Sequence, residues 1–330
     1  MKKTIIFYNS HQNGDIISVV QGIRWIIDRL DDSYNFLLVL NKKNNPIFIH
    51  SKIDFLELPI SFHGVPMNEP ILYCEENNYT AKDAIWIDTW IGSRENSRPF
   101  ILPPNNVWKL LLPDENGLYS SDSREIIWSL EFVHELFVII IKSLNELLFE
   151  ENTESYIPVP DLNDLLLKIN NNSVFDNEVK NFIIQHNRFY KKILICNGDV
   201  QSGQRENFSY EEYFEEQIAS NPNVAFYFTD KKNELKYDNV FYINDYFSLP
   251  NLNQILYLTQ YIDVIFSSQS GPGCLSYNDK YINDERKILF IICDSNFKPY
   301  VKDVKCKMLL ANNYEISFMN KLLTLAIHET

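Results

Sequence analysis

The chain has 330 residues, and its 30 Lys and Arg against 44 Asp and Glu give a formal net charge of −14 at pH 7. An acidic chain repels the phosphates of nucleic acid and of anionic membranes, so neither is an expected partner, although a local basic pocket for a small anion is still allowed. The composition is 45% hydrophobic and 14% aromatic, which excludes a disordered or fibrous protein. At this length we expect two domains of about 150 residues each.

The cysteines and the apolar runs indicate in which cellular compartment the protein is expected. The five cysteines form no C-x-x-C pair and leave one over, which argues against a disulfide framework or a zinc site. The apolar run Ile5–Tyr8 is too short for an export signal, and Leu136–Ile141 is far shorter than the roughly 20 residues of a membrane helix. We therefore expect a cytoplasmic protein without a transmembrane segment.

The first half of the chain alternates apolar runs with helical patterns. Thr4–Phe7 predicts a buried strand, and helical spacing of apolar residues predicts a helix from about Asp15 to Leu30. Further strands are expected at 36–40, 47–50 and 84–88, an irregular stretch at 92–122, and a long helix at about 123–149. Strands that alternate with helices predict a βαβ-type domain with a mainly parallel sheet.

Pro158 and Pro160 interrupt this pattern, because a residue before proline disfavours helix and prolines stiffen a linker. We therefore expect an N-terminal domain of residues 1–157 and a C-terminal domain of residues 158–330. The second half repeats the arrangement, with strands expected at 192–196, 224–228, 240–243, 264–267 and 288–292 and helices at about 210–220, 252–261 and 316–328. The predicted fold class is α/β, with two Rossmann-like domains facing each other across a cleft.

A polar segment, Asn-Ser-His-Gln-Asn-Gly-Asp, follows the first expected strand and ends at Asp15. In an open parallel sheet, ligands bind beyond the carboxyl ends of the strands, so these side chains can reach a substrate. Asp15 is a candidate general base, and His11 is its rival. The alternative is that Asp15 only caps the helix, with Gly14 as its permissive neighbour.

The segment NGDVQSGQRENFS, residues 197–209, is a candidate site for a diphosphate. Backbone N–H groups, the N-terminus of the next helix and Arg205 would stabilise anionic oxygens there. A solvated loop with Asn207 or Ser209 as the cap of that helix would look nearly as polar.

A second polar segment, SSQSGPGCLSYN, covers residues 267–278. Gly271 would let the backbone approach a ligand, and Pro272 suits the first turn of a helix. Its serines and Gln269 offer hydrogen-bonding groups to phosphate or sugar oxygens. A capped turn is the alternative, and the segment is not a dinucleotide fingerprint because Ser276 stands where the third glycine should be.

Other motifs are absent or ambiguous. The sequence has no P-loop, no H-E-x-x-H and no G-x-S-x-G, and it lacks the Asp-x-Asp pair with which nucleotide-sugar sites often hold a divalent cation. We therefore expect no metal and no other cofactor. WIDTWIG, residues 86–92, indicates strand and core, although Asp88 and Trp90 would fall at the carboxyl end of that strand.

Taken together, these segments resemble a GT-B glycosyltransferase, and Gly14-Asp15-Ile16-Ile17 resembles the heptosyltransferase-like family (glycosyltransferase family 9) in particular. In that family the Gly-Asp pair opens the first helix, and the Asp is thought to act as base on the acceptor hydroxyl. The late motif of the family usually reads Asp-[Ser/Thr]-Gly-x-x-His. Here Gln269 stands at the Asp position and Cys274 at the His position, which leaves the donor sugar open.

The resemblance implies a metal-independent, inverting glycosyltransferase that moves a sugar from a nucleotide-sugar donor to a glycan, lipid-linked glycan or other hydroxyl acceptor. It implies an N-terminal domain that binds the acceptor and a C-terminal domain that binds the donor. The alternatives are a nucleotide-sugar epimerase or hydrolase of the same fold, or a non-catalytic carbohydrate- or nucleotide-binding protein. The catalytic candidates are Asp15 and His11; the donor-binding candidates are Asn197, Ser202, Gln204, Arg205, Asn244, Asp245, Ser268, Ser270, Gly271 and Pro272; the acceptor-binding candidates are Asn13, Gly14, Asp88 and Trp90.

Overall fold

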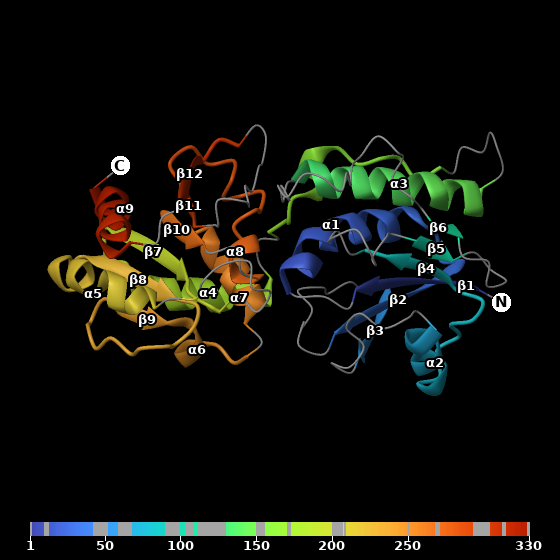
Figure 1. The fold of residues 1–330 in the computed structure, drawn as a ribbon, viewed down its shortest axis with the longest axis horizontal. Coiled ribbons are helices and arrows are strands. Elements are labelled where there is room, and N and C mark those ends of the chain that lie inside the picture. Colours follow the sequence, from blue (N-terminus) through green and yellow to red (C-terminus); the bar gives the residue numbers. More distant parts are fainter. Residues whose placement is uncertain are drawn as a thin grey trace. The chain divides into compact units, whose positions relative to one another are not determined.

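The structure is a computed structural model of the chain. It describes residues 2–9, 13–41, 52–58, 68–89, 100–102, 109–110, 130–149, 156–169, 173–199, 207, 209–249, 251–267, 271–292, 304–311 and 315–328. The chain divides into two compact units; among the described residues, the first ends at Leu166 and the second begins at Leu167. Each unit contains one sheet with helices packed on it (Figure 1), which confirms the α/β prediction.

The sheet of the first unit has the strand order β3-β2-β1-β4-β5-β6. Its strands are β1 (Lys3–Asn9), β2 (Tyr34–Asn41), β3 (Ile53–Leu58), β4 (Ile85–Asp88), β5 (Phe100–Leu102) and β6 (Lys109–Leu110). The pairs among β1 to β4 are parallel, whereas β5 and β6 pair antiparallel. Ile5, Ile6 and Phe7 in β1 are fully buried, because helices cover both faces of a central parallel strand.

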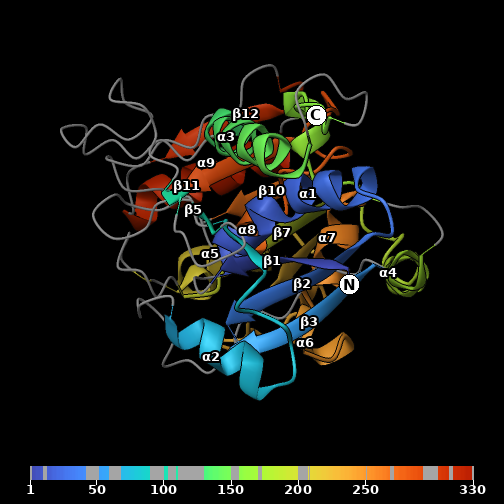
Figure 2. The same ribbon diagram turned by 90° about the vertical axis from the view of Figure 1, so that its right-hand side faces the viewer.

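The helices of the first unit are α1 (Asn13–Arg29), α2 (Asn68–Glu76), α3 (Leu130–Leu148) and the short 3₁₀ helix η2 (Leu162–Leu165). Helices α1 and α3 lie on one side of the sheet and α2 on the other (Figure 2). Gly22 makes the close approach of α1 and α3 possible, because a Cβ at this position would lie 2.2 Å from the ring of Phe137.

The segment that contains the prolines belongs to the first unit. Trp25 Nε1 donates a hydrogen bond to the Pro158 carbonyl (2.7 Å), and His134 Nε2 lies 2.9 Å from the Pro160 carbonyl. These bonds hold the segment on α1 and α3. The division after Leu166 therefore lies later in the chain than the expected boundary after residue 157.

The sheet of the second unit has the order β12-β11-β10-β7-β8-β9, and all its neighbouring strands are parallel. The strands are β7 (Lys191–Cys196), β8 (Val224–Phe228), β9 (Val240–Tyr242), β10 (Val264–Ser267), β11 (Ile288–Ile292) and β12 (Lys307–Ala311). Counted from the first strand of each unit, both sheets follow the order 3-2-1-4-5-6 of the doubly wound dinucleotide-binding fold. This order confirms the prediction of two Rossmann-like domains.

The helices of the second unit are α4 (Val174–Ile184), α5 (Tyr210–Ser220), α6 (Ile243–Tyr246), α7 (Leu252–Thr259), α8 (Gly271–Cys274) and α9 (Ile316–His328). Helices α5 and α9 pack together on the sheet, and α4 packs on α7. Two buried lysines stabilise helix C-termini: Lys191 Nζ donates to the Ile327 carbonyl of α9 (3.3 Å), and Lys287 Nζ to the Gln260 carbonyl after α7 (3.2 Å).

The elements that differ from the expectations have physical reasons. Strand β3 at Ile53–Leu58 was missed because most of its residues are only partly buried and Asp54 and Glu57 break the apolar run. Strands β5 and β6 fall in the stretch expected to be irregular. The expected strand at 47–50 and the start of the helix at 123–129 lie outside the described residues. Within the described ranges, every helix is too short or too polar to cross a membrane.

Candidate active site

The strand orders define one switch point in each unit, where the connection changes direction along the sheet. In the first unit it lies between β1 and β4, where Tyr8 and Asp88 are register partners. In the second unit it lies between β7 and β10, where Cys196 and Ser267 are partners. Ligands of open α/β sheets bind in the crevice beyond the carboxyl ends of such strands. These two switch points are therefore the candidate sites, each within its own unit.

Helix α1 follows the switch-point strand of the first unit and begins at Asn13. Gly14 and Asp15 lie in its first turn. A carboxylate in the first turn of a helix is stabilised by the helix dipole, which favours its ionised form. The side chains of Asn13 and Asp15, and the whole of His11, lie outside the described part of the chain.

Buried polar residues join the ends of β1 and β4. Asn9 Nδ2 donates to Thr89 Oγ1 (3.3 Å), and the Thr89 hydroxyl and N–H both donate to the Tyr8 carbonyl (3.2 and 3.0 Å). Asp88 is the last residue of β4 and is only 7% exposed, whereas Trp90 lies outside the described residues. Asn9 and Thr89 were not predicted as site residues, although a polar residue that ends a buried strand is a signal for such a position.

Asn197 directly follows β7, and its side chain is fully used inside the second unit. Its Nδ2 donates to Glu211 Oε1 (3.0 Å) and to the Asp230 carbonyl (2.8 Å). Its Oδ1 accepts from the Asp230 N–H (2.8 Å) and from Thr229 Oγ1 (3.3 Å). An amide has no further donor to offer, and Asn197 is completely buried. These bonds let Asn197 position the loop that follows it, and contact between Asn197 and the donor stays a prediction.

Glu211 completes this network from the first turn of α5. The carboxylate is completely buried and accepts hydrogen bonds from Asn197, from the Lys232 N–H (3.2 Å) and from the Ser209 hydroxyl (3.4 Å). Ser209 is the N-cap of α5 and accepts from the Glu212 N–H, as the loop alternative predicted. The first turn of α5 carries two carboxylates, Glu211 and Glu212, whose negative charge opposes an anion at this N-terminus. Ser202, Gln204 and Arg205 lie outside the described residues.

The second polar segment begins at the end of β10, beside the end of β7. Gly271 and Pro272 open α8, as predicted, but this helix has only four residues and therefore a weak dipole. Ser276 Oγ donates to the Gly273 carbonyl (2.6 Å) and closes the turn. Ser268 and Ser270 lie outside the described residues.

Cys274 occupies the position where the resembling family has histidine. Burial, and then the neighbouring Cys274, raise the pKa of the Cys196 thiol well above its usual value. This electrostatic contact places Cys274 of α8 beside the end of β7. A buried Cys196 stays protonated at neutral pH and does not act as a base.

Asn244 and Asp245 lie on α6, which follows the edge strand β9 rather than a switch-point strand. Asn244 Oδ1 accepts from Asn251 Nδ2 (2.7 Å), and Asp245 Oδ2 accepts from Lys231 Nζ (3.4 Å). The structure thus separates them from the β7 and β10 ends by the width of β8.

Lys231 and Lys232 were not predicted, although they follow β8 at the carboxyl edge of the sheet. Lys232 forms an ion pair with Asp199, at the start of the loop after β7, and Lys231 pairs with Glu234 (2.9 Å). These are cations next to the loop that the sequence assigns to a diphosphate. Within the described residues, no group of three or more His, Cys, Asp or Glu side chains is placed to share a metal ion.

No protein-family model matches the chain, and no curated protein sequence matches it. Its fold does match solved structures. The E. coli heptosyltransferase WaaC with ADP-2-deoxy-2-fluoro heptose gives a TM-score of 0.56 at 11% identity, over 99% of this chain and 100% of that chain. WaaC with ADP gives 0.52 at 9% identity, over 98% and 99%. The chain therefore has the GT-B fold of the heptosyltransferases, as the resemblance of its first loop predicted.

Proposed function

We propose that the protein is a glycosyltransferase that moves a sugar from a nucleotide-sugar donor to a hydroxyl group of a glycan or lipid-linked glycan. The observation that carries the proposal is the position of Gly14-Asp15 in the first turn of α1, directly after the switch-point strand of a heptosyltransferase fold. Solved structures of this fold hold ADP and an ADP-heptose analogue, which supports a nucleoside-diphosphate sugar as the class of donor.

In the proposed reaction Asp15 takes the proton of the acceptor hydroxyl while that oxygen attacks the anomeric carbon. The bond from the anomeric carbon to the diphosphate breaks, and its electron pair leaves with the nucleoside diphosphate. A single displacement of this kind inverts the anomeric configuration. A general base in this role contributes about 10²–10⁴-fold to the rate.

Arg205, backbone N–H groups of the 197–209 loop and the serines at 268 and 270 would stabilise the departing diphosphate. Their charge and hydrogen bonds would make a divalent cation unnecessary. The buried bonds of Asn197 and Glu211 support this role, because they fix the base of the loop on β8 and α5. Asn244 and Asp245 remain candidates for nucleobase or ribose contacts.

A second candidate function is nucleotide-sugar binding without transfer. The observation in its favour is Cys274, which lies beside the end of β7 at the position of the family's histidine. A thiol there replaces a side chain that donates strong hydrogen bonds. On this alternative the donor is bound and not consumed.

The test is product analysis with UDP-, ADP-, GDP- and dTDP-sugars, with and without a mixture of glycan acceptors. We expect release of nucleoside diphosphate that depends on the acceptor and persists after exhaustive EDTA treatment. Free or epimerised sugar formed without acceptor would identify a hydrolase or epimerase, and binding without turnover a non-catalytic protein. Complete loss with EDTA that Mg²⁺ or Mn²⁺ restores would contradict metal independence.

A further inference from the structure

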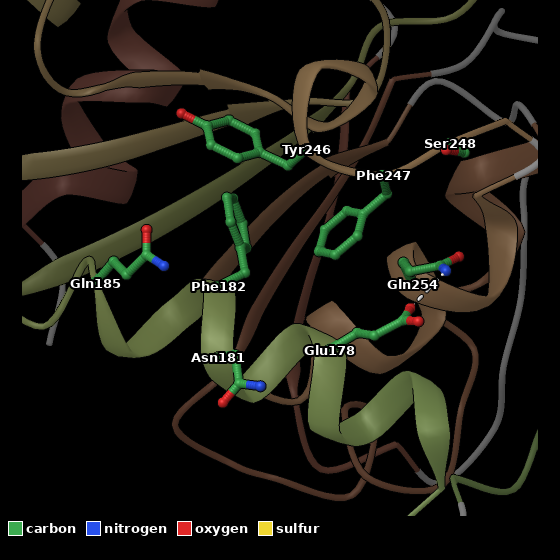
Figure 3. A pocket seen from close by; sticks show the side chains of 8 residues that line it. All are labelled: Glu178, Asn181, Phe182, Gln185, Tyr246, Phe247, Ser248 and Gln254. Atoms are coloured by element: carbon green, nitrogen blue, oxygen red, sulfur yellow. Dashed lines mark hydrogen bonds between the residues drawn. The ribbon is translucent and has the colours of Figure 1, made fainter.

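A pocket of about 490 Å³ opens on the second unit (Figure 3). None of its lining residues belongs to the segments that follow β7 or β10. Helix α4 and its C-cap line one wall, the chain after α6 another, and α7 a third. The lining residues are Glu178, Asn181, Phe182, Gln185, Tyr246, Phe247, Ser248 and Gln254. The volume falls within the range of about 300–1,000 Å³ that small-molecule sites occupy.

Three aromatic rings form one part of this pocket. The ring of Phe182 lies 4.6 Å from that of Tyr246 and 5.2 Å from that of Phe247, between centroids (Figure 3). Phe182 and Phe247 are 5% and 9% exposed, whereas Tyr246 is 49% exposed. Phe182 also packs on Phe241 in β9, so the cluster is anchored in the core. The result is a fixed aromatic platform with one ring open to solvent.

Polar groups complete the lining. Asn181, Gln185 and Gln254 supply amides that both donate and accept, and Gln254 Nε2 donates to Glu178 Oε2 (2.9 Å; Figure 3). Gln254 Oε1 is buried without a hydrogen-bond partner among the described residues, so this acceptor lacks a donor. Glu178 is the one charged group among the eight lining residues, and no cation accompanies it there.

We propose that this pocket binds a neutral saccharide unit. The C–H groups on one face of a pyranose ring carry partial positive charge and pack on the negative face of an aromatic ring such as Tyr246. The hydroxyl groups of the sugar match the amides and the carboxylate of the rim. A phosphate or nucleotide would instead meet the unpaired negative charge of Glu178. The inference rests on the proposed function in one respect: the bound unit would be a further sugar of a glycan acceptor.

The test uses the full chain without any nucleotide, in saturation-transfer NMR with glucose, galactose and N-acetylglucosamine as probes. We expect at least one sugar to bind with a millimolar Kd and to receive most saturation on one ring face. Tyr246→Ala should weaken binding about five- to tenfold, because it removes the exposed ring. Tyr190→Ala is the matched control, since Tyr190 is 65% exposed and does not line the pocket.

Gln185→Ala is a second variant, at an exposed position of the rim, and should also weaken binding. Binding of none of the three sugars would overturn the proposal, as would equal weakening by Tyr246→Ala and Tyr190→Ala. Adenosine binding that Tyr246→Ala abolishes would identify a nucleoside pocket and overturn it as well. Sugar binding without transferase activity would support the saccharide pocket and refute the proposed function. Transferase activity without sugar binding would support the proposed function and refute the saccharide pocket.

Discussion

The first and second units follow the same strand order, but their sheets end differently. In the second unit β11 and β12 have five residues each and continue the parallel sheet, whereas in the first unit β5 and β6 have three and two residues and turn antiparallel. The strands on either side of the switch point, β1 with β4 and β7 with β10, are parallel in both. The far half of the sheet can therefore change without altering the pairing of the strands at the switch point.

The two switch points also differ in their polar side chains. In the second unit Asn197, Glu211 and Asp230 form a connected buried network, which fixes the start of the loop assigned to the diphosphate. In the first unit Asn9 donates to Thr89, whose hydroxyl and N–H both donate to the Tyr8 carbonyl.

The largest expected effect is the loss of sugar transfer when the proposed general base is replaced. Asp15→Asn should lower transfer about 10²–10⁴-fold, because an amide does not accept the proton at neutral pH. Stability should fall by no more than about 1 kcal/mol, the contribution of a carboxylate at a helix N-terminus. Nucleotide affinity should be unchanged, since we assign the donor to the second unit. Initial rates, urea denaturation and calorimetric titration measure the three quantities.

Asp28→Asn is the control, at the opposite end of α1. Its rate should match that of the unmodified protein. If Asp15→Asn turns over normally while His11→Ala does not, the base is His11. If neither change lowers transfer, the proposed mechanism is wrong.

The next effect concerns the diphosphate. Arg205→Ala should raise the Kd for a nucleoside diphosphate about 10- to 100-fold, the loss of one charge-assisted hydrogen-bonding group. Ser202→Ala and Ser270→Ala should each have a smaller effect. Arg286→Ala serves as control, because the Arg286 side chain is 83% exposed and pairs with Asp284. If all three variants bind the nucleoside diphosphate as tightly as the unmodified protein, the donor does not bind at this edge of the sheet.

His186 should make the stability of the second unit depend on pH. His186 is 6% exposed, and burial, followed by the charges of Arg188 and Lys192, lowers its pKa to about 4. The unfolded chain takes up this proton below about pH 6.5, whereas the folded chain does not. Stability therefore falls as the pH drops from 6.5 towards 4, by on the order of 2 kcal/mol, and this group causes no further loss below pH 4.

Two probes separate the units in this experiment. All proteins compared carry Trp128→Phe, after which every remaining tryptophan precedes residue 125 and belongs to the first unit. Tryptophan fluorescence then follows the first unit, and far-UV circular dichroism follows both. The circular dichroism transition should be the more sensitive to pH between 6.5 and 4. His186→Phe, which keeps an aromatic ring, should reduce this sensitivity. An unchanged pH dependence in His186→Phe would refute the assignment.

The smallest effect is expected in the first unit. Gly22→Ala should destabilise it by about 1–2 kcal/mol, because the new Cβ would lie 2.2 Å from the buried ring of Phe137. Alanine favours a helix over glycine by about 1 kcal/mol, which offsets part of the cost. Urea denaturation followed by tryptophan fluorescence measures the change. Adding Phe137→Leu should recover part of it, and an equal or higher midpoint for Gly22→Ala alone would contradict the packing argument.

The strands that are buried on both faces of the sheet could be predicted from the sequence. β1, β7, β8, β10 and β11 each contain an uninterrupted apolar run, and for such strands the length of the run and the flanking polar residues suffice. β3 carries Asp54 and Glu57 and was missed for that reason. The bonds that Trp25 and His134 make to the Pro158 and Pro160 carbonyls could not be predicted, because such long-range bonds have no local signature.

The sequence predicts which segments lie at the candidate site better than it predicts which side chains face it. The polar segments that the sequence singles out follow the buried strands at both switch points. The sequence does not predict the direction in which a side chain points: Asn197 and Glu211 point into the unit and hydrogen-bond to each other. The inward direction depends on Asp230 and Lys232, which the chain reaches only after another helix and strand.

The central claim, that the second unit holds the donor at its switch point, is tested most directly by hydrogen–deuterium exchange of the full chain with UDP, ADP, GDP and dTDP. For at least one nucleotide we expect slowed exchange in peptides that cover residues 197–209 and 267–275, and no change in residues 8–18. Slowed exchange centred on residues 8–18, or on the saccharide pocket at 178–185 and 246–254, would contradict the account. So would the absence of any change with all four nucleotides.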